Sequence, residues 1–132
     1  MKENVVKDKS LLFAIRIVKL YRHLTEIKKE FVLSKQILRS GTSVGAMVRE
    51  AEHAESILDF IHKMAIAQKE MNETLYWLEL LTKTDYLSQE QFENVNNDAL
   101  EIIKLITSII KTAKKNKQEN DKLLMINDKW LI

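Results

Sequence analysis

Proline is absent from this chain of 132 residues, and its only two glycines, Gly41 and Gly45, lie four positions apart. Proline breaks the interior of a helix and glycine weakens it, so nearly all of the chain lacks the usual interruptions of helical structure. The 45% of hydrophobic and 30% of charged residues provide both a core and a solvated surface, which argues against disorder. The composition therefore predicts one folded, helical domain.

Apolar residues recur at spacings of three and four along most of the chain, which is the period of an amphipathic helix. This period predicts four helices, at residues 10–26, 34–51, 56–83 and 88–113. Because the links between them are short, consecutive helices should be antiparallel. We therefore expect an all-α fold, an antiparallel up-down-up-down four-helix bundle, over residues 1–116, with a C-terminal tail over residues 117–132.

The last stretch of the chain, which includes the predicted tail, has a charged part, residues 114–122, followed by an apolar end. The apolar residues of this end are Leu123, Leu124, Met125, Ile126, Trp130, Leu131 and Ile132. A frayed terminus is one interpretation of the segment. Docking against the bundle or against a neighbouring copy is the other, because so much apolar surface is unfavourable in water.

Three predicted helix starts carry candidate capping residues. Ser10 or Asp8 would cap the first helix, and Ser34 would cap the second by accepting from the free backbone N–H groups of the first turn. Ser88 and Gln91 match a capping box, in which each side chain bonds to the backbone N–H of the other residue.

The two glycines fall in the middle of the second predicted helix, where each costs about 1 kcal/mol relative to alanine. We expect compensation by the close approach of another helix or of a neighbouring subunit. A loop is the alternative, because clusters of Gly, Ser and Thr commonly mark turns. The residues predicted to serve helix packing or an oligomer contact are Gly41, Val44, Gly45, Val48, Glu50 and Glu73.

Charge is divided along the chain, although the net charge is only +2. Residues 50–101 carry twelve acidic and three basic side chains, so the two flanking segments are basic. Such separation can create an electropositive face or complementary surfaces between subunits. If the basic face binds nucleic acid, the residues predicted to contact phosphates are Arg16, Lys19, Arg22, Lys35 and Arg39.

Charged residues also recur at the expected contact of the second and third helices. They are Arg39, Arg49 and Glu50 on the second helix, with Glu70 and Glu73 on the third. Ordinary surface charge is one interpretation. The other is a network between the helices that fixes the register of the bundle or of subunit contacts.

Residues for catalysis are not found in the sequence. Cysteine is absent, which excludes thiol chemistry and suits a reducing compartment, and there is no nucleophile elbow or phosphate loop. Glu50-x-x-His53 and Asp59-x-x-His62 have the spacing of a di-metal bundle site, but they lie beside a turn and off the apolar face. We expect no enzyme, catalytic residue, cofactor, metal or small-molecule substrate.

Neither a secretory signal nor a membrane span is predicted from the sequence. Charges are scattered through the first twelve residues, and the apolar runs are far shorter than the ~20 residues that cross a bilayer. We therefore expect a cytoplasmic protein with no membrane partner.

Residues 33–51, LSKQILRSGTSVGAMVREA, resemble the signature helix of a bacterial four-helix-bundle family, the 23S rRNA intervening-sequence proteins. Asp59-Phe60 and residues 71–81, MNETLYWLELL, extend the resemblance to about residues 12–113. The family usually has Asn where this chain has Met47, so a hydrogen bond from that amide is missing. Ser43, Glu50 and Glu73 match the family pattern.

The resemblance implies an antiparallel four-helix bundle and, from related proteins, a homopentameric ring. Some members are encoded inside insertions in large-subunit rRNA genes. A related branch of the family is the accessory protein of diversity-generating retroelements. Resemblance to this branch implies binding of nucleic acid and of a reverse transcriptase through basic surfaces. We therefore expect a non-enzymatic oligomer that binds RNA or another nucleic acid, with a protein-interaction scaffold as the alternative.

Overall fold

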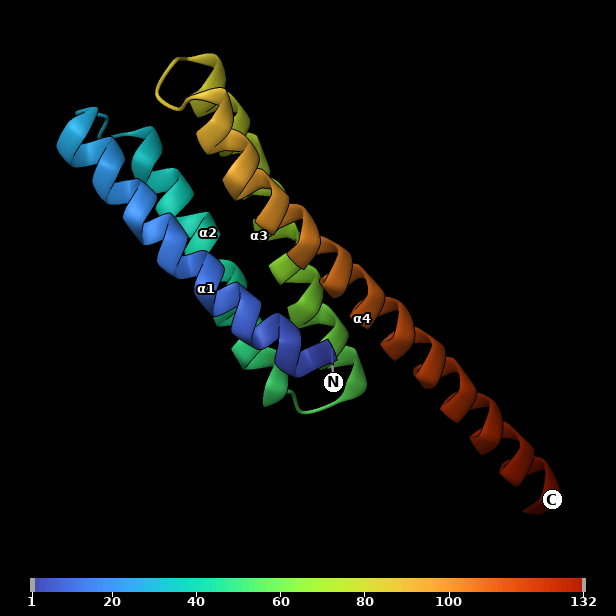
Figure 1. Ribbon diagram of the computed structural model, residues 1–132. Coiled ribbons are helices and arrows are strands. Elements are labelled where there is room, and N and C mark those ends of the chain that lie inside the picture. The colour runs from blue at the N-terminus through green and yellow to red at the C-terminus, as the bar shows by residue number, and fades with distance from the viewer. Residues whose placement is uncertain (1, 132) are drawn as a thin grey trace.

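The computed structural model describes the backbone of residues 2–131 and the side chains of residues 4–126. Within these residues the elements are α1 (Lys2–Arg22), the π-helical turn η1 (His23–Ile27), α2 (Leu33–Glu52), α3 (Ile57–Lys83) and α4 (Gln89–Leu131). Each helix packs on the next one in sequence, and α4 returns beside α1 (Figure 1). The predicted all-α, antiparallel up-down-up-down bundle is confirmed.

The first helix begins at Lys2, eight residues before its predicted start. Ser10 is therefore inside α1, where its buried hydroxyl donates to the Lys7 carbonyl oxygen at 3.0 Å. The prediction that Ser10 or Asp8 caps this helix is wrong. The helix extends further because Val6 lies on the same face as Phe13 and is buried with it.

The start of α2 is capped by Glu30, and the prediction that Ser34 caps it is wrong. The Glu30 carboxylate accepts from the backbone N–H groups of Val32, Leu33 and Ser34 at 3.1, 2.9 and 2.7 Å. Ser34 lies inside the helix, and its hydroxyl donates to the Glu30 carbonyl oxygen at 2.9 Å. One buried carboxylate thus satisfies three of the free donors at this helix start.

Serine side chains cap the starts of α3 and α4, and only the cap of α4 was predicted from the sequence. Ser56 accepts from the Asp59 N–H at 3.0 Å at the start of α3. Before α4, the Gln91 N–H donates to the Ser88 hydroxyl at 3.1 Å, and the Ser88 N–H donates to the Gln91 side-chain oxygen at 2.9 Å. The predicted capping box is confirmed.

The last helix continues to Leu131, well beyond its predicted end at Ala113. Figure 1 shows its second half projecting from the bundle as a single helix. The side chains of Leu123, Leu124, Met125 and Ile126 are exposed on this projection. Trp130, Leu131 and Ile132, the rest of the predicted apolar end, lie outside the residues whose side chains are described.

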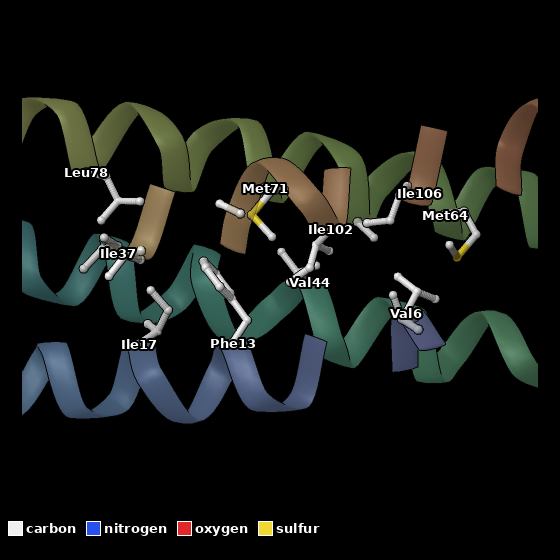
Figure 2. Close-up of a cluster of buried hydrophobic side chains, with 14 of the residues drawn as sticks. Val6, Phe13, Ile17, Ile37, Val44, Met64, Met71, Leu78, Ile102 and Ile106 are labelled. Atoms are coloured by element: carbon white, nitrogen blue, oxygen red, sulfur yellow. The ribbon is translucent and has the colours of Figure 1, made fainter. Parts of the chain in front are cut away.

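The core runs along the bundle axis between the four helices (Figure 2). It includes Phe13 and Ile17 of α1, Ile37 and Val44 of α2, Met64, Met71 and Leu78 of α3, and Ile102 and Ile106 of α4. The two methionines follow the same period as the neighbouring leucine and fill the core with it. Within the described part of the chain, no helix combines the length and apolar character that a membrane span requires.

Candidate nucleic-acid interface

The two glycines of α2 lie against α1 of the same chain. A Cβ added to Gly41 would lie 2.8 Å from Cγ1 of Ile17, and one added to Gly45 would lie 3.3 Å from the Ser10 carbonyl oxygen. Both glycines are buried, as are Val44 and Val48 of the same helix. The loop alternative is wrong, because α2 is helical through both positions. The close approach at these positions is made by a helix of the same bundle.

Arg39, which the sequence nominates for phosphate binding, is held by two carboxylates of α3. Its guanidinium donates to Glu70 at 2.9 Å and also to Glu73. The Trp77 indole N–H donates to the same Glu73 carboxylate at 3.0 Å. These contacts form the interhelical network that was one interpretation of the charges between α2 and α3.

Arg39 and Glu73 both have shifted pKa values. The hydrogen bond from Trp77 lowers the pKa of Glu73 most; burial raises it, and Arg39 lowers it further, so that the pKa lies below its usual value. The pKa of Arg39 is raised, chiefly by its hydrogen bond to Glu73. The carboxylate and the guanidinium therefore stay charged together over a wide pH range.

Glu50 and Arg49 take no part in that network and are exposed. They border a shallow hollow with His53 and Lys63. Asp59, from the second metal-like spacing, accepts from Lys63 at 3.2 Å and from the Glu55 N–H at 3.1 Å. Among residues with described side chains, no group of three His, Cys, Asp or Glu is placed to hold a metal ion.

Arg16, another nominated phosphate-binding residue, pairs with α4. Its guanidinium donates to the Asp98 carboxylate and to the Asn94 carbonyl oxygen, the latter at 3.3 Å. Lys9 of the same helix lies 2.6 Å from Glu101. These contacts link α1 to α4, whereas Arg39 links α2 to α3, so the two arginines lie at different helix contacts.

The other three nominated residues, Lys19, Arg22 and Lys35, are exposed. Lys19 borders a hollow of about 310 Å³ between α1 and α4, together with Arg16, Gln91 and Asn94, so two of the nominated residues meet there. Lys35 belongs to α2, in the first turn after the Glu30 cap. The five nominated residues thus form no single patch, and two of them are neutralised by carboxylates.

A row of lysines on α4 was missed by the sequence reasoning. Lys104, Lys111, Lys115 and Lys122 are spaced seven, four and seven apart, which places them within about 40° of one another around the helix axis. All four side chains are exposed, and none has an ion-pair partner among the described residues. We call these four residues the lysine row; it extends over about 27 Å of helix.

The spacing of the lysine row could have revealed it once α4 was known to be continuous. The sequence prediction ended the helix at Ala113, which separated Lys115 and Lys122 from the two lysines before them. Residues 102–126 carry six lysines against two acidic residues. Four exposed ammonium groups in line can attract a linear polyanion, since nothing in the described structure neutralises them.

The comparisons with known proteins identify relatives of this chain. The sequence model of the family described as "23S rRNA-intervening sequence protein" matches residues 2–108. A crystal structure of a protein of unknown function from the S23 ribosomal protein family of Bacteroides thetaiotaomicron is 66% identical. It covers 84% of this chain and 99% of its own, with a TM-score of 0.84. No curated protein gave a significant match.

Proposed function

The chain belongs to the 23S rRNA-intervening sequence protein family, and from this premise we propose that it is a non-enzymatic, homo-oligomeric protein that binds nucleic acid. The ligand class is RNA or another nucleic acid, bound through its phosphate backbone. The observation that carries the proposal is the lysine row on α4, whose four ammonium groups are exposed and have no ion-pair partner among the side chains that the structure describes.

The chemistry of the lysine row favours backbone contacts. A lysine ammonium binds phosphate as a compact point charge and displaces counterions from the nucleic acid. Such contacts position a protein without reading bases. The sequence carries no RNA-recognition signature, so binding should depend on charge and shape more than on base sequence.

The homo-oligomer in this proposal is supported by the outer face of α1. Val5, Leu11, Leu12 and Ile15 are exposed large apolar residues on that helix. The glycines of α2 already contact α1 and are therefore not free for a neighbouring subunit. We propose the outer face of α1 as the contact between copies, with a pentameric ring as the number that the family resemblance implies.

A titration with a structured RNA over a range of salt concentrations tests the proposal. Replacing Lys111 and Lys115 together by Gln should weaken binding at low salt and reduce the slope of log K against log salt by about 0.7–0.9 per lysine. Lys83→Gln, an exposed lysine at the end of α3, is the matched control and should change neither quantity. No binding of wild-type protein at low salt, or equal weakening by Lys83→Gln, would overturn it.

A protein-interaction scaffold is the second candidate function. The neutralisation of Arg16 and Arg39 favours it, because these charges then serve the bundle and not a polyanion. A pull-down that returns the same protein partner with and without nuclease treatment would support a scaffold. Loss of that partner after nuclease treatment would count against it.

A further inference from the structure

The projecting part of α4 has a second face, opposite the lysine row. Ala113, Asn116, Asn120 and Leu124 follow one another at spacings of three or four. They continue the buried stripe that includes Ile106 and Ile109 beyond the end of the bundle. We call Ala113, Asn116, Asn120 and Leu124 the seam; within the described residues, no other helix covers its outer end, and Leu124 is 61% exposed.

An open hollow lies where α4 leaves the bundle. It has a volume of about 320 Å³ and is lined mainly by apolar side chains, Ala51, Ala54, Ile57, Phe60 and Ala113. The hollow can accept a branched aliphatic side chain. The Leu124 side chain of the same chain does not reach this hollow. Leu124 lies eleven residues after Ala113 on α4, which is about 16 Å along the helix axis.

We propose that two copies of this chain pair through their projecting α4 helices in an antiparallel arrangement. Leu124 of each copy then lies beside Ala113 of the other and enters its hollow. A two-fold axis between the copies fills both hollows at once. Parallel pairing would instead place Leu124 against Leu124 and leave both hollows open.

The charges along the helix favour the antiparallel register. Lys117 and Asp121 form an ion pair of 2.7 Å within one chain. When Ala113 stands opposite Leu124, Lys117 of each copy also stands next to Asp121 of the other, so the two ion pairs become one four-charge group. Parallel pairing would place Lys117 against Lys117, and like charges repel.

The seam residues also suit a close helix pair. Ala113 is small and faces the large Leu124, a combination that interdigitates well. Asn116 and Asn120 lie between them, and polar residues inside a helix seam fix the register. The lysine row lies on the opposite side of α4 and stays exposed in both copies. The pairing goes beyond the proposed function and adds an assembly contact to it.

Measurement of mass in solution by light scattering tests the pairing. Leu124→Glu should halve the mass, whatever number of copies the outer face of α1 holds together. Met125→Glu is the matched control, because Met125 is equally exposed, at 62%, and lies off the seam. An unchanged mass for Leu124→Glu, an equal loss for Met125→Glu, or a monomeric wild type would overturn the proposal. The proposal would also be overturned if the wild-type protein were a monomer that binds anionic lipid vesicles and Leu124→Glu abolished that binding.

Disulfide trapping tests the direction of pairing, because the natural chain contains no cysteine. The double variant Ala113→Cys/Leu124→Cys should form covalently linked pairs under mild oxidation. Leu124→Cys alone should not, because two copies of residue 124 would be about 16 Å apart, too far for a disulfide. Linkage by Leu124→Cys alone would indicate parallel pairing and overturn the antiparallel assignment. RNA binding, measured on the same samples, reports on the proposed function separately.

Discussion

The backbone carbonyl oxygen of Ser10 in α1 would lie only 3.3 Å from a Cβ placed on Gly45 in α2. A backbone atom has little freedom to move, so a large side chain at position 45 must push α1 and α2 apart. We expect Gly45→Leu to lower the free energy of unfolding by about 1–3 kcal/mol, measured by chemical denaturation. Gly45→Ala should be close to neutral, because the higher helix propensity of alanine offsets the tight contact.

The mass of the Gly45→Leu protein separates two roles for this glycine. Because Gly45 faces α1 of the same chain, the folded variant should keep the wild-type mass in solution. A lower mass with unchanged stability would contradict this account and assign Gly45 to a contact between subunits.

The contact between Gly41 and Ile17 predicts a pairwise coupling. An added Cβ at position 41 would lie 2.8 and 2.9 Å from Cγ1 and Cγ2 of Ile17, which is β-branched and fully buried. A stiff side chain cannot turn aside, so Gly41→Ala should destabilise the protein by about 1–3 kcal/mol. In an Ile17→Ala background the same change should cost much less. Equal costs in both backgrounds, measured by denaturation, would show that Ile17 is not the obstacle.

The helical bundle could be predicted because its pattern is local. The apolar period of Phe13 and Ile17, and the Ser88–Gln91 box, each depend on a few neighbouring residues. The Glu30 cap could not be found in this way. Its carboxylate reaches forward to residues 32–34 only because η1 and the link after it hold Glu30 in place, and the usual search considers Ser, Thr, Asp and Asn.

The candidate site was harder to predict, because the residues that neutralise a charged side chain can be far from it in the sequence. Arg16 and Asp98 are separated by 82 residues, and Arg39 and Glu73 by 34. Nothing in the local sequence shows that these arginines are neutralised. The lysine row follows a helical spacing, but its recognition required knowing that α4 continues past Ala113.

The Glu30 cap predicts a pH-dependent contribution to stability. Burial alone would raise the pKa of Glu30, but the hydrogen bonds from Leu33, Ser34 and Val32 together hold it below its usual value of 4.5. A carboxyl group whose pKa is lower in the folded state stabilises the fold above its unfolded pKa, and this contribution is lost as pH falls through the folded pKa. We expect Glu30→Ala to lower the free energy of unfolding by about 1–2 kcal/mol at pH 7.

Glu30→Gln is the control for the charge of the cap. It keeps one acceptor oxygen but cannot ionise, so it should be less stable than wild type at pH 7. That difference should shrink below pH 4.5, as wild-type Glu30 becomes protonated. A difference that stays constant down to the acid transition, measured by urea denaturation at each pH, would show that the charge of Glu30 contributes nothing.

The last prediction concerns the group formed by Arg39, Glu73 and Trp77. Arg39→Met should lower the free energy of unfolding by only about 0.5–1 kcal/mol, because the guanidinium is half-exposed. Arg39→Lys should recover part of this loss but not all, since one ammonium cannot reproduce two directed contacts to Glu70 and Glu73. The pKa of Glu73, measured by NMR titration, should rise in both Arg39→Met and Trp77→Phe, because each removes a donor to its carboxylate. An unchanged Glu73 pKa in Trp77→Phe would show that the indole contact is not formed in solution.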